Sequence, residues 1–279
     1  MALKIVETVR NGHLYIAHRG ARSLAPENTL ASGRKALELG AGMWEIDVRM
    51  SRDGKPVVVH DATLERTSDA KVLYPERKPW NVHDFTLAEL KSLDLGSWFA
   101  RSDPFRQVAA GAVSAGELKR YESERIPTLK EALEFTLRND WLVNVELKDL
   151  SGCVGHREIA AITAGLVSSL SAVGNVLVSS FNLDYLAEIK RIDANIRTGV
   201  LIEHVLTDPV DLMRRLDAFT FHPAVRAFST KHVGKMIELG CHTLVWVVNN
   251  RNVAGSLMKN GVSGVFTDFP QSIRPARCR

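Results

Sequence analysis

The segment MWEIDV, residues 43–48, alternates apolar side chains with two carboxylates. Side chains two positions apart on a β-strand point to the same face of the sheet. Glu45 and Asp47 therefore share one face, and the apolar residues beside them share the other face. In a barrel of parallel strands, the outer face packs beneath helices, and the inward face at the carboxyl end of each strand carries the catalytic side chains. The segment is typical of one such strand.

Further short segments rich in β-forming residues alternate with helical patterns, which favours parallel strands joined by helical crossovers. The chain has 279 residues, a normal length for one α/β barrel. We therefore predict a single (β/α)8 barrel, a TIM barrel, over residues 1–279. One strand candidate is in excess of the eight that such a barrel needs, the candidates being 14–17, 43–48, 56–59, 142–147, 176–179, 198–202, 218–221, 243–247 and 264–266.

The helical segments carry recognisable start signals. Thr128-x-x-Glu131 is a capping box, and leucines at helical spacing follow it. Asn28 or Thr29 is expected to cap the first helix of the barrel, because both residue types accept hydrogen bonds from free backbone N–H groups.

The segment at about 62–125 interrupts the alternation of strands and helices. It contains one clear helix, which begins at the capping box Thr86-x-x-Glu89. We expect the remainder, including the stretch 106–124, to be a charged loop. An excursion of this length within a compact domain is usually functional or disordered, so we predict a small insertion in the barrel.

Composition narrows the classes of function. The formal net charge is +4, from 36 basic and 32 acidic residues, without a basic stripe of the kind that nucleic-acid-binding proteins show. Cys153, Cys241 and Cys278 are scattered and odd in number, which favours a reducing compartment. The first ten residues have no signal-peptide core, and the apolar runs are too short to cross a bilayer. We therefore expect a cytoplasmic protein that binds a small molecule, with no nucleic acid and no membrane span.

A second strand repeats the pattern of polar residues two positions apart. Glu146 and Lys148 share a face of the strand predicted at 142–147 and its end. Glu45, Asp47 and Glu146 would then converge from separate strands as a site rich in oxygen ligands, which suits Mg²⁺ or Ca²⁺ better than Zn²⁺. The residues alone leave a second interpretation open, in which Glu146 and Lys148 form a buried ion pair and the other two carboxylates are solvated.

Two histidines end predicted strands. His18 follows the strand at 14–17, and His60 follows the strand at 56–59. An imidazole has an unperturbed pKa of ~6.5 and can both accept and donate a proton near neutral pH, which are the two acts that cleavage of a phosphodiester requires. The adjacent Asp61 is a candidate to orient His60. A histidine at a strand end more often has a structural role, and we keep that interpretation for the others.

The ordered set of motifs resembles the glycerophosphodiester phosphodiesterase family. The matching segments span nearly the whole chain, and they are His18-Arg19-Gly20, Pro26-Glu27-Asn28-Thr29, Glu45-Ile46-Asp47, His60-Asp61, Leu64-x-Arg66-Thr67, Asn144-Val145-Glu146-Leu147-Lys148, Ser180-Phe181, Trp246-x-Val248-Asn249 and Thr267-Asp268-x-Pro270.

The resemblance implies a barrel of the PLC-like phosphodiesterase type, with the inserted region over its mouth selecting the alcohol side of the substrate. It implies metal-dependent hydrolysis of glycerophosphodiesters to sn-glycerol 3-phosphate and an alcohol, in which the glycerol 2-hydroxyl attacks phosphorus and water opens the cyclic phosphate. The resemblance implies that the catalytic groups are His18 and His60. It implies that the ligands of a divalent cation, Mg²⁺ or Ca²⁺, are Glu45, Asp47 and Glu146. The implied substrate-binding groups are Arg19, Lys148 and Trp246.

Two other functions remain open at this point. The nearer one is a lysophospholipase D-type phosphodiesterase, which an exposed apolar patch on the insertion would favour and the polar stretch 114–125 disfavours. The more distant one is a non-catalytic phosphoester-binding barrel, and the presence of competent residues at all the implied catalytic and metal positions argues against it. The sequence leaves open the alcohol that is released and whether the chain forms a homo-oligomer.

Overall fold

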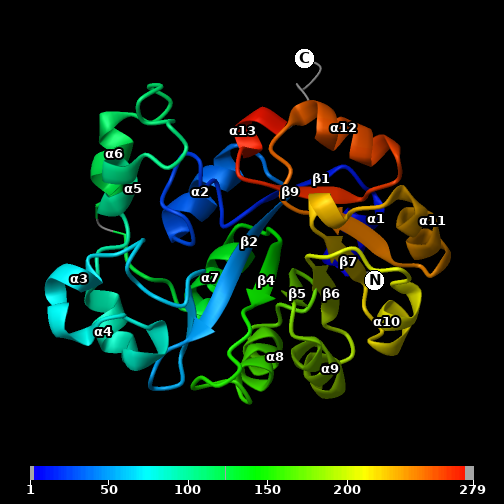
Figure 1. Ribbon diagram of the computed structural model, residues 1–279, viewed down its shortest axis with the longest axis horizontal. Coiled ribbons are helices and arrows are strands. Elements are labelled where there is room, and N and C mark those ends of the chain that lie inside the picture. Colours follow the sequence, from blue (N-terminus) through cyan, green and yellow to red (C-terminus); the bar gives the residue numbers. More distant parts are fainter. Residues whose placement is uncertain (1–2, 123, 274–279) are drawn as a thin grey trace.

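Eight parallel strands close into a barrel in the computed structural model, which describes residues 3–122 and 124–273 (Figure 1). Around the ring, β1 pairs with β2, and the order continues through β4, β5, β6, β7, β8 and β9 back to β1. The strands are β1 (Leu14–Ala17), β2 (Met43–Met50), β4 (Val143–Leu147), β5 (Val176–Ser180), β6 (Arg197–Ile202), β7 (Thr220–Pro223), β8 (His242–Val245) and β9 (Gly264–Thr267). The predicted TIM barrel is confirmed.

The candidate strand at 56–59 is the one in excess of the eight that the barrel needs. β3 (Pro56–Val58) pairs with the carboxyl end of β2 in an antiparallel arrangement, with Val48 opposite Val58, and it lies outside the ring. The short turn at 51–55 explains this, because it is too short for the helical crossover that two parallel strands require. His60 therefore follows an antiparallel extension of β2 and not a strand of the barrel.

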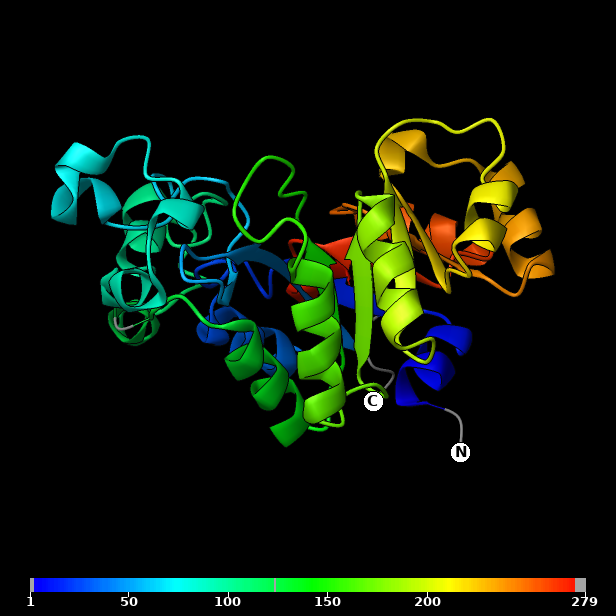
Figure 2. The ribbon, with the colours of Figure 1, turned by 90° about the horizontal axis from the view of Figure 1, so that it is seen from below.

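Helices alternate with the strands of the barrel (Figures 1 and 2). They are α2 (Leu30–Glu38), α7 (Leu129–Arg138), α8 (Ile159–Ser169), α9 (Leu183–Ile192), α10 (Val210–Arg215), α11 (Thr230–Glu238, preceded by η3 at Val225–Ala227), α12 (Arg251–Lys259) and α13 (Pro270–Ile273). The predicted capping box at Thr128 is present, and Thr29 is the N-cap of α2. The amino-terminal helix α1 (Lys4–Arg10) buries Ile5, Val6 and Val9 against the apolar interior of the barrel.

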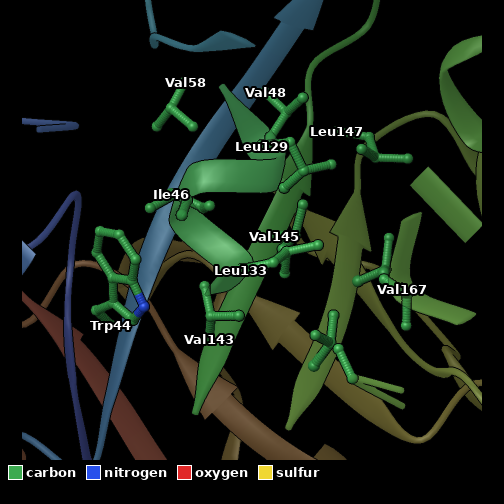
Figure 3. Close-up of a cluster of buried hydrophobic side chains, with 14 of the residues drawn as sticks. Trp44, Ile46, Val48, Val58, Leu129, Leu133, Val143, Val145, Leu147 and Val167 are labelled. Carbon is green, nitrogen blue, oxygen red and sulfur yellow. The ribbon is translucent and has the colours of Figure 1, made fainter. Parts of the chain in front are cut away.

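The outward face of β2 packs as its alternation predicts. Trp44, Ile46 and Val48 are fully buried with the outward residues of β4 and with leucines of α7 (Figure 3). The indole N–H of Trp44 donates a hydrogen bond to the Thr136 hydroxyl at 2.9 Å, and its ring stacks on Trp141. A polar atom of this large side chain is thereby satisfied inside the core, and β2 is held so that its carboxylates face inward.

The segment between β3 and β4 is more regular than the sequence predicts. Besides the expected helix α4 (Leu87–Ser92) it contains α3 (Ala70–Leu73), η1 (Pro75–Arg77), η2 (Val82–Asp84), α5 (Ser97–Ser102) and α6 (Ala115–Tyr121). The prediction of a loop over 106–124 is therefore wrong in part. The elements are short, but two apolar clusters bury residues such as Phe85, Leu90 and Phe99 completely, and this tertiary packing stabilises helices too short to form alone.

No helix in the described part of the chain combines the length and the apolar character that a membrane span needs. Cys153 and Cys241 carry free thiols, and Cys278 lies outside the described residues.

Candidate active site

A cavity of about 290 Å³ opens at the carboxyl ends of the barrel strands. The alternation of side chains explains its lining, because every second residue of each strand points inward and the pattern continues past the strand end. Thus Leu14, Ile16 and then His18 share one face, as do Met43, Glu45 and Asp47. The cavity is lined by His18, Arg19, Glu45, His60, Asn144, Glu146, Lys148, Phe181, Leu201, Glu203, Trp246, Val247 and Phe266.

The three predicted carboxylates come together. One oxygen each of Glu45, Asp47 and Glu146 lie within 4.8 Å of one another, and all three residues are buried. Oxygen Oε1 of Glu45 has no hydrogen-bond partner among the described residues. Buried carboxylates this close repel one another unless a cation lies between them. The donor set, the mutual distances and the unpartnered oxygen all fit a hard divalent cation, so this group could bind a metal.

The carboxylates differ in their electrostatic surroundings. Burial, together with the charges of Asp47 and Glu146, raises the pKa of Glu45 well above its usual value. Burial acts in the same direction on Asp47, but the cations Lys148 and Arg19 outweigh it and hold the pKa of Asp47 well below its usual value. The pKa of Glu146 is raised by burial, against the attraction of Lys148. A cation bound between the three groups would favour the ionised form of each.

Lys148 bridges two of these carboxylates. Its Nζ lies 2.9 Å from Oδ1 of Asp47 and 2.5 Å from Oε1 of Glu146. The buried ion pair that the sequence left open is therefore present, but it lies within the carboxylate group and does not replace it. Burial would lower the pKa of Lys148, and the two carboxylates reverse this and raise it, so the ammonium is charged at neutral pH.

Arg19 is tied into the site by its backbone as well as its side chain. Its φ of 55° lies in the left-handed region, and its backbone N–H donates to Oε2 of Glu45 at 2.7 Å. Gly20 follows with φ of 77°, and a Cβ there would lie 2.3 Å from the Ser32 hydroxyl, so a larger residue would not fit this turn. The guanidinium donates to Oε1 of Glu27 at 2.9 Å and lies 3.4 Å from Oδ2 of Asp47.

Each candidate catalytic histidine is fixed by a carboxylate. His18 lies 2.7 Å through Nδ1 from Oδ1 of Asp268, and His60 lies 2.7 Å through Nδ1 from Oδ1 of Asp61. An ionised carboxylate only accepts hydrogen bonds, so Nδ1 carries the proton in both histidines and Nε2 is left to accept one. Burial lowers the pKa of His18 to about 4, against the opposing effect of Asp268. The expected contact between Asp61 and His60 is thus observed.

Some residues that organise the site have no clear signal in the sequence. Asp268 is 250 positions from His18, and nothing in their spacing indicates that they meet. Asn28, the candidate cap that α2 does not use, donates from Nδ2 to Oδ2 of Asp47 at 2.7 Å and accepts from the Asp47 backbone N–H. Glu27 binds three arginines, Arg19, Arg22 and Arg66. Asp268, Asn28 and Glu27 each lie in a segment that matches the family, and this match is the only feature of the sequence that indicates their importance.

The inserted segment does not line the cavity, contrary to the expectation that it covers the mouth. Among the residues that the structure describes, none between Asp61 and β4 belongs to the cavity lining. The segment lies to one side of the barrel and reaches the site indirectly, through Arg66, which donates to both Glu27 and Asp61 (Figure 1). It packs against α2 and the loop after β1, through the ion pair of Lys35 with Glu117 and the hydrogen bond from the Tyr121 hydroxyl to the Leu24 carbonyl.

Comparison with known proteins identifies the family of the chain. Residues 18–272 match the glycerophosphoryl diester phosphodiesterase family. A glycerophosphodiester phosphodiesterase of Caldanaerobacter subterraneus subsp. tengcongensis is 32% identical over 260 residues, which cover 93% of this chain and 96% of that protein. A glycerophosphodiester phosphodiesterase of Bacillus subtilis is 29% identical, over 92% of this chain and 84% of that protein.

Solved structures agree with this result. An Oleispira antarctica phosphodiesterase, solved in complex with the product sn-glycerol-3-phosphate, is 30% identical with a TM-score of 0.78, over 95% of this chain and 97% of that chain. A glycerophosphodiester phosphodiesterase from Agrobacterium tumefaciens shares the fold at 24% identity with a TM-score of 0.71, over 94% and 98% of the two chains. The chain therefore belongs to the glycerophosphoryl diester phosphodiesterase family, a family of phosphoric diester hydrolases.

Proposed function

We propose that this enzyme hydrolyses glycerophosphodiesters to sn-glycerol 3-phosphate and an alcohol, with His18 and His60 as the groups that transfer protons. The observation that carries the proposal is the meeting of two carboxylate-fixed histidines and three buried carboxylates at one cavity. The sn-glycerol-3-phosphate bound as product in the Oleispira antarctica phosphodiesterase supports the same product for this enzyme.

The metal site of the proposal consists of Glu45, Asp47 and Glu146. A divalent cation held there would offset the negative charge of the phosphate and lower the pKa of a hydroxyl group close to it. Mg²⁺ and Ca²⁺ are the ions that suit such a set of carboxylate ligands. Asn28 and Lys148 hold Asp47 in place through its two oxygens, as groups around a metal site commonly do for its ligands.

The proton transfers belong to the two histidines. We infer that the Nε2 atom of one accepts the proton of the glycerol 2-hydroxyl as this oxygen attacks phosphorus, and that the other histidine protonates the departing alcohol oxygen. The roles then reverse when water opens the cyclic phosphate. Asp268 and Asp61 support this exchange because each accepts the Nδ1 proton of its histidine, which fixes the ring and leaves Nε2 to exchange a proton.

Substrate binding falls to Arg19, Lys148 and Trp246. Arg19 and Lys148 are the cations that line the cavity beside the carboxylates, which makes them the natural partners of phosphate oxygens. Trp246 offers an apolar ring on another side of the same cavity, and its indole N–H is already satisfied by the His222 carbonyl at 2.8 Å.

The identity of the phosphorus-containing product tests this proposal. A hydroxyl beside the ester makes intramolecular attack available, with effective molarities of ~10⁵ M and above. Glycerophosphocholine should give sn-glycerol 3-phosphate, and a 1,2-cyclic phosphate should be visible early by phosphorus NMR. Bis(p-nitrophenyl) phosphate lacks the hydroxyl and should be cleaved poorly. Release of phosphocholine would overturn the proposed orientation of the substrate. Fast cleavage of bis(p-nitrophenyl) phosphate would overturn the attack by the glycerol 2-hydroxyl.

A second candidate substrate class is the lysophospholipids. Val72 and Leu73 of α3, in the inserted segment, are 71% and 49% exposed, and adjacent exposed aliphatic residues are one sign of a lipid-facing surface. The substitution Val72→Ser with Leu73→Ser should lower turnover of lysophosphatidylcholine relative to glycerophosphocholine if lipid is the preferred substrate. An unchanged ratio of the two rates would exclude a role for this pair.

A further inference from the structure

Three further inward-facing residues line the cavity. Phe181 follows β5, Glu203 follows β6 and Trp246 follows β8, and each continues the inward side of its strand. In the closed order of the barrel, β6 lies four strands from β1 in either direction. Glu203 therefore faces His18 across the barrel, and the part of a substrate that extends away from the metal site would point toward these residues.

The two aromatic rings form a right-angled corner. Their centroids are 5.6 Å apart and their planes meet at 84°. Trp246 is fixed by the hydrogen bond from its indole N–H to the His222 carbonyl, and Phe181 is 41% exposed, so part of its ring is open to solvent. In such an edge-to-face pair the positive edge of one ring meets the negative face of the other, and a cation would bind over the ring faces that remain open to the cavity.

Glu203 adds a full negative charge to this side of the cavity. Its side chain is about half exposed, and its ion-pair partner Arg226 is 66% exposed on the surface. An exposed pair of this kind contributes little free energy and leaves the carboxylate able to attract another cation. The cavity-lining cations Arg19 and Lys148, in contrast, are engaged by Glu27, Asp47 and Glu146.

We propose that Phe181, Trp246 and Glu203 form a binding site for the cationic head group of the alcohol, which makes alkylammonium esters such as glycerophosphocholine the preferred substrates. Ring faces together with a carboxylate are the arrangement that recognises quaternary ammonium groups. The inference rests on the proposed function for the orientation of the substrate, with glycerol at the carboxylates and the alcohol toward Phe181, Trp246 and Glu203.

The test compares two esters of the same shape. Glycerophosphocholine is set against the glycerophosphate ester of 3,3-dimethylbutan-1-ol, in which a neutral carbon replaces the ammonium nitrogen. The wild-type enzyme should favour the choline ester in kcat/KM by on the order of tenfold, the effect of a partly desolvated cation–π contact with added charge. Glu203→Gln and Phe181→Leu should each bring this ratio toward one, and Arg226→Gln should increase it by releasing Glu203.

Asp208→Asn is the matched control, since Asp208 is a carboxylate of the same loop that pairs with Lys235 and does not line the cavity. It should leave the ratio unchanged. A wild-type ratio near one, or a ratio that Glu203→Gln does not alter, would overturn the head-group site while hydrolysis itself stands. Failure to cleave either ester would overturn the proposed function instead. In that case, calorimetric measurement of the affinity for each ester tests the head-group site separately. The site predicts tighter binding of the choline ester, and equal affinity for the two esters would refute it.

Discussion

At the scale of single residues, the site is organised by charges that are paired before any substrate arrives. Glu27 is the clearest case, because it accepts hydrogen bonds from Arg19, Arg22 and Arg66 and is 5% exposed. Burial alone would raise the pKa of Glu27, but the hydrogen bond from Arg66 and the charges of the other two arginines lower it from 4.5 to about 2. The carboxylate therefore holds the loop after β1 together and joins it to the inserted segment through Arg66.

The first prediction concerns this carboxylate. Because the folded-state pKa of Glu27 is depressed, its stabilising contribution is present above pH 4.5 and is lost as the pH falls toward 2. Glu27→Gln should lower the free energy of unfolding at pH 7 by about 3 kcal/mol, since it removes the buried negative charge that three arginines share. Urea titrations should show the difference from wild type narrowing below pH 4.5. A difference that is constant from pH 7 to pH 3 would contradict the assignment.

The second prediction concerns the histidines. Positioned acid–base catalysis is worth roughly 10²–10⁴-fold in rate, so His18→Ala and His60→Ala should each lower kcat for glycerophosphocholine by about that factor. His156→Ala is a suitable control, because His156 does not line the cavity and instead pairs with Tyr185. Thermal melting should show that the two site variants remain folded. Turnover near that of the wild type in either one would remove that histidine from the mechanism.

The residues that could be predicted from the sequence are those whose direction follows from a strand. Glu45, Glu146 and Lys148 line the cavity, and Asp47 lies beside Glu45 and Glu146, because a period of two along β2 and along β4 and its end fixes their face. The pairing of His18 with Asp268 could not be predicted, since it depends on the closure of the barrel between β1 and β9. A contact of that kind depends on the ring as a whole and not on any local pattern.

At the scale of elements, sequence patterns located the strands but not the relation of β3 to the barrel. Its short run of apolar, β-branched residues is like that of a buried barrel strand, and only its antiparallel pairing with β2 distinguishes it. The short helices α5 and α6 were missed for a related reason, since their stability comes from tertiary contacts. Phe99 and Tyr121 pack edge to face, and the side chains of Lys35 and Glu117 join α2 to α6.

The third prediction tests the contact between these helices. Gly96 precedes α5, and a Cβ there would lie 1.6 Å from the backbone oxygen of Tyr121, the last residue of α6. Gly96→Ala should therefore lower the free energy of unfolding by about 3 kcal/mol or more, beyond the usual cost of overpacking. Gly116→Ala is the control, since the nearest atom to its Cβ would be 3.7 Å away, and alanine should stabilise α6 slightly. Equal melting temperatures for the two variants would contradict the packing described.

At the scale of the whole molecule, we propose that the inserted segment and the barrel form one domain. Arg66, Tyr121 and Glu124 connect the segment to the loop after β1 and to α2, with Glu124 accepting a hydrogen bond from the Ala31 backbone N–H. We expect one calorimetric unfolding transition, with the van't Hoff enthalpy equal to the calorimetric enthalpy. Two resolved transitions would show that the segment unfolds separately.

The spread of the family motifs along the whole chain explains why the sequence alone indicates a function. The motifs that match the family are spread from His18 to Pro270, and the barrel gathers most of them at the carboxyl ends of its strands. What the sequence could not indicate was the position of the inserted segment beside the cavity, because the exit direction of the chain after His60 depends on how its helices pack against α2.

The central claim is that Glu45, Asp47 and Glu146 hold a divalent cation that hydrolysis requires, and chelation tests it most directly. Wild-type enzyme stripped with EDTA and shown by elemental analysis to be free of metal should not hydrolyse glycerophosphocholine, as followed by phosphorus NMR. Addition of Mg²⁺ or Ca²⁺ should restore turnover, and Glu45→Gln or Glu146→Gln should need a higher concentration of the ion, since an amide lacks the charge that a hard cation needs. Full turnover by the metal-free enzyme in excess EDTA would contradict the account.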